Sequence, residues 1–259
     1  MDKEKTQILV LVEGGRIDVN LMRHLLTVYG ISQNHEIVSY NTNIYELYNH
    51  MFRDEDPNTI DFLQLLKEHE KDPAKKPIFD RYYSDILLIF DLDPQDPQFS
   101  PDKIKEMAAF FVESSDMGKL YLNYPMVEAF YHMRAIPDKD YESYAASMRE
   151  LRDKAYKARV QRENRDHDYR KFAINREECS IVIRQNILKV IILSIPDSKL
   201  LLVVVEGKEL VRGVEVFVIF AVTGLDFAVV PWCERLNEFV LNTKPLKRYL
   251  EKSLFVGTL

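Results

Sequence analysis

The chain has 259 residues, of which 46% are apolar, so it can bury a sizeable core and does not belong to the disordered class. Its 35 Lys and Arg against 41 Asp and Glu give a net charge of −6, which excludes a generally basic protein but permits a local basic face. Charges interrupt every apolar run before the roughly 18 residues that a membrane-spanning helix needs, which predicts a protein that does not enter the membrane.

The cysteines and the first residues of the chain give information about its cellular location. Cys179 and Cys233 have neither metal-ligand spacing nor the spacing of a disulfide framework. The first seven residues, MDKEKTQ, lack an apolar signal segment. Both features predict a cytoplasmic location.

Strand and helix patterns alternate through the first half of the chain. Short apolar runs predict strands, and apolar positions at helical spacing predict helices between them. This alternation predicts an α/β fold with a small, doubly wound, mainly parallel sheet over residues 1–137. The strands are expected at 8–12, 35–40, 86–90 and 118–124, and the helices at 17–28, 42–52, 60–70 and 102–114.

The character of the chain changes near residue 138, where we place the boundary of a second, mostly helical and partly basic region, 138–259. A helical apolar stripe is expected through Tyr144, Met148, Leu151, Ala155 and Ala158. Residues 181–195 predict another helix and residues 200–205 a strand.

A basic segment, residues 149–171, contrasts with the acidic chain. From residue 144 to residue 176, ten Lys and Arg stand against five Asp and Glu. Such a run is usually a solvated face, but its cations could also track a phosphate backbone in DNA or RNA. The candidates for nucleic-acid contact are Arg152, Lys157, Arg159, Arg162 and Arg165.

Carboxylates follow two of the buried strands. The run DILLIFDLD ends in Asp91 and Asp93, and Glu13 follows the apolar run ILVLV. Ligands of open α/β sheets bind at the carboxyl ends of the strands, and alternate strand residues point the same way. Like charges this close repel unless a proton or cation lies between them, and Mg²⁺ prefers oxygen ligands. The pattern therefore predicts a magnesium site, in which Mn²⁺ could substitute.

These motifs resemble a known family. The pieces ILVLVEGGRID and DILLIFDLD resemble the Toprim domain of topoisomerases, primases and overcoming-lysogenization-defect nucleases, and NYPMVEAF resembles the nuclease branch. The resemblance implies that Glu13 is a metal ligand or general acid/base, that Asp91 and Asp93 hold Mg²⁺, and that Glu128 supports a second metal or orients the site. Asp18 falls one residue later than the acidic position of the Glu-Gly-x-x-Asp form. Standalone nucleases of this kind tend to accompany a separate ATPase in phage defence.

The expected function is thus Mg²⁺-dependent cleavage of phosphodiester bonds in DNA or RNA. One alternative is a non-catalytic module for nucleic-acid binding or assembly, with the apolar C-terminal third as a homo-oligomer interface. Another is a haloacid-dehalogenase-like phosphatase with Asp91 as nucleophile, although Gln95 stands where that pattern requires Thr or Val. Blander explanations also exist, because Glu-Gly is common turn chemistry, an Asp can cap a helix, and Glu128 can face solvent.

Overall fold

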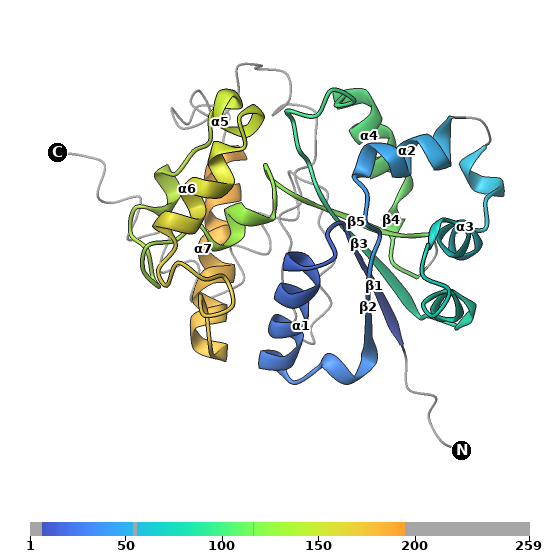
Figure 1. Cartoon of the computed structure of the whole chain (residues 1–259), viewed down its shortest axis with the longest axis horizontal. Helices are drawn as coiled ribbons and strands as arrows, with labels where there is room; N and C mark the ends of the chain where they lie inside the picture. Colours follow the sequence, from blue (N-terminus) through green and yellow to red (C-terminus); the bar gives the residue numbers. More distant parts are fainter. Residues whose placement is uncertain (1–6, 54–55, 116, 195–259) are drawn as a thin grey trace. The chain divides into compact units, whose positions relative to one another are not determined.

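The computed structural model describes residues 7–53, 56–115 and 117–194 (Figure 1), and all of them belong to one compact unit. The strand predicted at 200–205 and the remaining C-terminal third lie outside the described residues. Within the described ranges, no helix has the length and apolar character needed to cross a membrane.

The described residues build the predicted α/β fold around a five-stranded sheet of order β2-β1-β3-β5-β4. The first four strands in this order run parallel, and only the short edge strand β4, which the sequence did not predict, is antiparallel. The strands are β1 (Ile8–Val12), β2 (His35–Ser39), β3 (Asp85–Asp91), β4 (Val112–Glu113) and β5 (Gly118–Asn123).

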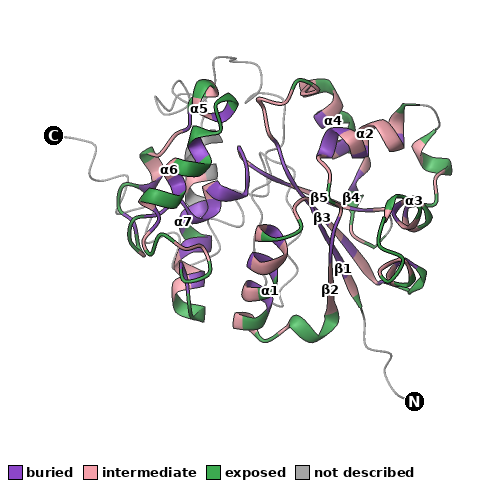
Figure 2. Cartoon of the chain, in the orientation of Figure 1, coloured by how far each residue is buried: buried purple, intermediate pink, exposed green. Residues whose placement is uncertain are grey.

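The register places the carboxyl ends of the central strands side by side. Val12 at the end of β1 is level with Ile89 of β3, and Asp91 at the end of β3 is level with Asn123 of β5. Strands β1 and β3 are buried along most of their length (Figure 2), as their uninterrupted apolar runs require. Any polar residue just beyond these runs therefore emerges at one common edge of the sheet.

Helices cover both faces of the sheet (Figure 1). Val10 and Val12 join a core cluster with α1 and α7, whereas Leu9 and Leu11 join a second cluster with α2, α3 and α4. Alternate residues of β1 thus face opposite layers. The helices are α1 (Ile17–Tyr29), α2 (Ile44–Phe52), α3 (Phe62–His69), α4 (Pro101–Phe110), α5 (Met148–Arg152), α6 (Ala155–Glu163) and α7 (Arg176–Ser194).

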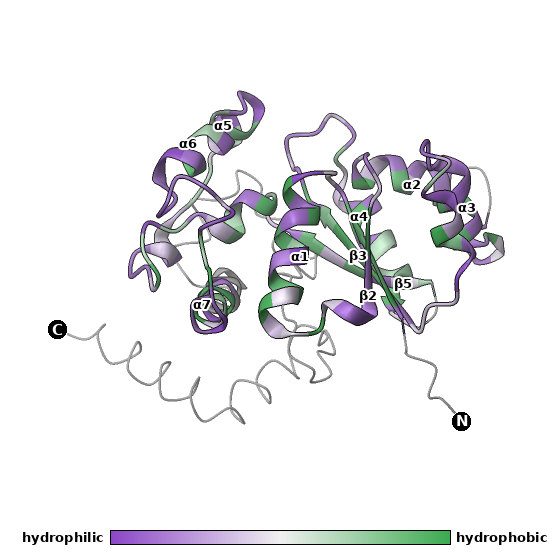
Figure 3. Cartoon of the chain, turned by 60° about the horizontal axis from the view of Figure 1, so that its bottom comes forward, coloured by the Kyte–Doolittle hydropathy of each residue, from purple (hydrophilic) through white to green (hydrophobic). Residues whose placement is uncertain are grey.

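The helical stripe predicted from residue 144 is wrong in detail. Two short helices, α5 and α6, replace it, and Lys154 between them has a φ of 56°, which a continuous helix cannot contain. After this break Tyr156 and Val160 are buried, while the predicted core residues Ala155 and Ala158 are exposed. The outer faces of α5 and α6 are hydrophilic (Figure 3).

Residues on either side of position 138 share one core. Leu25 of α1, Phe130, Val160 of α6 and Val182 of α7 belong to the same buried apolar cluster. The helices after residue 138 therefore pack onto the α1 face of the sheet unit. The division into domains 1–137 and 138–259 stays a prediction.

Candidate metal centre

Glu13, Asp91 and Asp93 meet at the carboxyl edge of the sheet. One carboxylate oxygen from each lies within 4.8 Å of the other two. Glu13 directly follows β1, Asp91 is the last residue of β3, and these two strands are neighbours. Within the described part of the chain, no other three Asp, Glu, His or Cys side chains converge this closely.

Backbone and side-chain hydrogen bonds hold the first two carboxylates in place. The N–H of Glu13 continues the ladder by donating to the carbonyl of Ile89 at 3.1 Å. In return, the backbone N–H of Asp91 donates to Oε2 of Glu13 at 3.0 Å. Oδ1 of Asp91 accepts from Nδ2 of Asn123 at 2.9 Å and from the N–H of Val127 at 2.8 Å. Oδ2 of Asp91 is therefore the oxygen left to meet a cation.

Asp93 reaches the cluster by a different route from the one predicted. Strand β3 ends at Asp91, so the alternation of strand side chains does not aim Asp93. A φ of 43° at Asp93 turns the chain instead, and its N–H donates to the carbonyl of Pro125 at 2.9 Å. Nε2 of Gln95 donates to Oδ1 of Asp93 at 2.9 Å and fixes the side chain.

Two further carboxylates lie beside this trio. Asp18 is 8% exposed and Glu128 is 3% exposed, and both raise the pKa of Asp91. Oδ1 of Asp18 and Oε2 of Glu128 are buried oxygens without a hydrogen-bond partner. Glu128 thus does not face solvent, although it is not part of the group of three.

Asp18 also explains the glycine after Glu13. The N–H of Gly14 donates to Oδ2 of Asp18 at 2.5 Å, and a Cβ added to Gly14 would lie 2.3 Å from that oxygen. Glycine is needed because the carboxylate approaches the backbone so closely. A phosphate therefore does not have free access to the N–H of Gly14.

One lysine from the helical region reaches this acidic edge. Lys157 of α6 places its Nζ 3.3 Å from Oε1 of Glu128. Burial lowers the pKa of Lys157, but the carboxylates of Glu128, Asp91 and Asp93 outweigh it and the pKa is raised. Lys157 stays an ammonium ion and lies at the acidic edge, with its side chain 53% exposed.

The negative charge of Glu13, Asp91 and Asp93 is only partly neutralised by nearby cations of the described residues. Burial raises the pKa of Glu13 to about 8, with Asp93 and Asp18 adding to the rise, while the N–H of Asp91 and Lys157 oppose it. Burial and then the charge of Glu13 raise the pKa of Asp91, and burial raises that of Asp93. Buried carboxylates this close need protons or a cation. Their oxygens suit a hard divalent ion, so Glu13, Asp91 and Asp93 could hold a metal ion.

The basic segment, residues 149–171, is not gathered into one site. Arg159 pairs with Glu150 at 2.8 Å, and Arg165 pairs with Glu178 at 2.7 Å. Arg152 and Arg162 are exposed and have no ion pair within the described residues. Of the five predicted contacts for nucleic acid, the structure therefore leaves two outward-facing cations and one lysine at the acidic edge.

Comparisons of the chain with protein-family models, with curated proteins and with solved structures find no match. The resemblance to Toprim nucleases therefore rests on the sequence motifs alone.

Sequence reasoning missed one residue of this site, Asn123, and did not foresee the position of another, Lys157. Asn123, 7% exposed, holds Asp91, and its signal was present as a polar residue closing the apolar strand GKLYLN. Lys157 was assigned to nucleic-acid contact because it lies in a basic run. Only the tertiary packing of α6 near Val127–Tyr131 brings it to Glu128, and no local pattern contains that information.

Proposed function

We propose that this chain is a Mg²⁺-dependent endonuclease of the Toprim type that cleaves phosphodiester bonds in DNA or RNA. One observation supports the proposal above all: carboxylates from two neighbouring parallel strands converge within 4.8 Å at the ligand-binding edge of the sheet. Among the described residues, the ammonium of Lys157 at the cluster's margin and the backbone N–H of Asp91 partly offset their negative charge. Acidic oxygens held without full compensation are what a hard cation and the phosphate it carries would use.

Under this proposal, the acidic residues and Lys157 have different roles. Glu13, Asp91 and Asp93 hold the ion, which when bound supplies a Lewis acid for activating water and for stabilising charge on the phosphate. The resemblance implies general acid/base work as the alternative role of Glu13, in which its carboxylate would accept a proton from the attacking water. The ammonium of Lys157 neutralises negative charge that develops on the phosphate.

Asp18 and Glu128 extend this site. Their partnerless buried oxygens, Oδ1 of Asp18 and Oε2 of Glu128, flank the cluster and would orient it or support a second cation. The two-cation arrangement is the role that the resemblance implies for Glu128.

The resemblance further implies a setting. Standalone nucleases of this type accompany an ATPase in phage defence, and this sequence has no phosphate-binding loop of the ATPase kind. We therefore propose a separate ATPase protein as partner and antiviral defence as the role.

Cleavage assays test the proposal. The purified chain is incubated with plasmid and with tRNA in Mg²⁺, Mn²⁺ or EDTA, and Asp91→Asn is compared with Asp85→Asn. Asp85 begins the same strand at the opposite edge of the sheet, so it is a matched control. We expect metal-dependent cleavage that Asp91→Asn abolishes and Asp85→Asn retains.

Other results would select the alternatives. Equal cleavage by the wild type and Asp91→Asn would refute the assigned site. Tight nucleic-acid binding with neither cleavage nor metal dependence would favour the non-catalytic module. Hydrolysis of a small phosphate ester with an aspartyl-phosphate at Asp91 would favour the phosphatase.

A further inference from the structure

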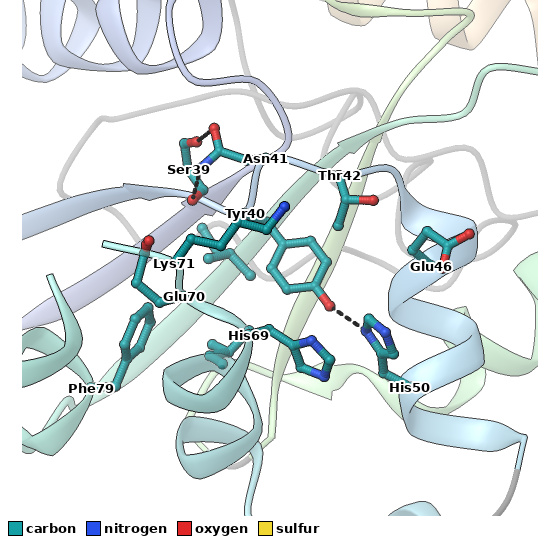
Figure 4. Close-up of a pocket in the computed structure, with 12 residues that line it drawn as sticks. Ser39, Tyr40, Asn41, Thr42, Glu46, His50, His69, Glu70, Lys71 and Phe79 are labelled. Atoms are coloured by element: carbon teal, nitrogen blue, oxygen red, sulfur yellow. Dashed lines mark hydrogen bonds between the residues drawn. The ribbon is translucent and has the colours of Figure 1, made fainter. Parts of the chain in front are cut away.

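A cavity of about 230 Å³ lies where β2 ends, between α2 and α3 (Figure 4). Its lining includes apolar side chains of the sheet and α3 layer, among them Leu11, Leu66 and Phe79. Asn41, His69 and Lys71 also line it and are exposed. The site thus combines apolar lining residues with a polar, accessible rim, as small-molecule sites do.

Aromatic rings form one side of this cavity. The rings of His50 and His69 stack with centroids 3.8 Å apart and an interplanar angle of 21°. Nδ1 of His50 shares a 2.8 Å hydrogen bond with the hydroxyl of Tyr40, which Figure 4 shows beside the stacked pair. Burial, followed by the neighbouring His69, lowers the pKa of His50, so this ring is neutral at pH 7. A stack of flat rings suits a flat ligand.

Acidic side chains line the inside of the cavity, and a lysine lies at its rim. Glu46 and Glu70 line it, and their carboxylates accept hydrogen bonds from Nε2 of Gln98 and from the N–H of Asp72, both at 2.7 Å. These acids disfavour an anion within the cavity. Lys71 makes no ion pair within the described residues and reaches across the cavity (Figure 4), so an anionic group would bind at the rim.

Two hydrogen-bonded connections, one through the backbone and one partly through side chains, link the cavity to the metal centre. The N–H of Asn41 donates to the carbonyl of Glu13 at 3.0 Å, so the rim begins one strand away from the carboxylates, a spacing of about 4.8 Å. On the other side, Gln98 bonds Glu46 and also donates its N–H to Oδ1 of Asp96 at 2.7 Å. The N–H of Asp96 in turn donates to the carbonyl of Asp93 at 2.9 Å.

We propose that this cavity binds one unpaired base of a single-stranded nucleic acid, with a neighbouring phosphate on Lys71 and the next phosphate over the carboxylates. The inference rests on the proposed nuclease function and assigns its substrate class. A volume of about 230 Å³ is below the range of roughly 300–1,000 Å³ for drug-sized ligands and is suited to a single base. A paired base could not enter without leaving its stack.

Binding measured without cleavage tests this subsite. Fluorescence anisotropy is recorded in Ca²⁺ with labelled oligo-dT, oligo-rU and a blunt duplex of equal length, and a gel verifies that the probes stay intact. His69→Ala removes the outer ring, His69→Phe keeps a flat ring, and Lys71→Ala removes the rim cation. Lys139→Ala is the matched control, because Lys139 is an exposed lysine outside the cavity lining.

We expect single strands to bind more tightly than the duplex. His69→Ala should weaken single-strand binding by about fivefold to a hundredfold, the range for one lost base–aromatic stack. His69→Phe should bind like the wild type, and Lys71→Ala should weaken binding and reduce its salt dependence. Photocrosslinks from 5-bromouracil should map to Tyr40, His50 or His69.

Three results would overturn the subsite: no single-strand binding by the wild type, tighter binding of the duplex, or equal affinity of the wild type and His69→Ala. The nuclease proposal fails separately. If binding depends on His69 but no metal-dependent cleavage occurs, the base subsite stands and the nuclease proposal is refuted. If metal-dependent cleavage occurs but His69→Ala binds as tightly as the wild type, the nuclease proposal stands and the base subsite is refuted.

Discussion

The two charged regions of this molecule are organised in opposite ways. At the sheet edge, acids from distant parts of the chain converge, are largely buried and outnumber Lys157, the cation of the described residues that reaches them. In the basic segment, residues 149–171, cations that are close in sequence point to different partners, as Arg159 and Arg165 do in pairing with Glu150 and Glu178. The sequence suggested a site in both regions, from strand ends for the acids and from a local count of charge for the cations, but only the acidic residues are gathered by the topology.

This difference shows that charged residues form a site where the fold brings them together. Parallel strands in register deliver the residues after them to one edge, whatever their separation in sequence. A helix distributes its residues around its axis, so a run of basic residues is divided among several faces. Convergence, rather than composition, therefore distinguishes the acidic edge from the basic segment.

The largest expected effect comes from removing one acidic charge without disturbing the fold. Asp93→Asn keeps an oxygen for Gln95, and Asn tolerates the left-handed backbone at this position. We expect cleavage to fall by about a hundredfold or more, since even outer partners of metal ligands cost 10- to 100-fold. The rate of plasmid or tRNA cleavage measures it, and Asp102→Asn at an exposed position of α4 is the control. An unchanged rate would remove Asp93 from the metal centre.

Lys157 sharpens the comparison, because it lies in the basic run but serves the acidic edge. Lys157→Gln should slow cleavage by about 10- to 100-fold, comparable to losing one group that stabilises transition-state charge. The same change should tighten Mn²⁺ binding, because it removes a cation that opposes the ion. Titration calorimetry and cleavage rates measure both effects. Lys154→Gln should change neither, and parallel losses in binding and rate would contradict this division.

Thermal unfolding should reveal the uncompensated acids through pH. The pKa of Glu13 in the folded, metal-free chain is raised to about 8 from 4.5, so folding is favoured below pH 4.5 and that contribution is lost as pH rises through 8. A divalent ion needs the ionised carboxylate, so its stabilising effect should grow over the same range. We expect Mn²⁺ to raise Tm more at pH 8 than at pH 6. A rise in Tm that is constant or shrinks with pH would contradict the raised pKa.

The smallest effects should appear in the basic segment itself. Arg165→Gln breaks a two-bond contact with Glu178 on α7 and should lower the free energy of unfolding by about 1 kcal/mol. Arg162→Gln, which loses no ion pair within the described residues, should leave stability unchanged and reduce the salt slope of nucleic-acid binding by about one. Denaturant unfolding and salt titrations measure both. Equal destabilisation by the two changes would erase the distinction between paired and outward arginines.

The central part of the fold was readable from the sequence because its signals are local. The short apolar runs before Glu13 and Asp91 indicate buried strands. Gly30 ends α1 in the left-handed conformation that glycine permits. Strand pairing then brought Glu13 beside Asp91 as predicted. Alternation did not account for Asp93, because its turn depends on hydrogen bonds to residues 30 or more positions away.

The helical region was less readable because its signals are not local. Nothing in the run around Lys154 marks the left-handed break that replaces one helix by α5 and α6. The place of Lys157 follows from how α6 packs, and the cavity beside His50 and His69 follows from how α2 meets α3. Such features arise from contacts between elements, which spacing along the chain does not encode.

One measurement tests the shared ion directly. Crystals grown with Mn²⁺ give an anomalous difference map that locates the ion independently of any assumed mechanism. We predict a peak bound by carboxylate oxygens of Glu13, Asp91 and Asp93, at about 2.1 Å, near the distance that hard octahedral ions adopt. A fully loaded crystal with no peak at these three residues, or with its peak elsewhere, would contradict the account.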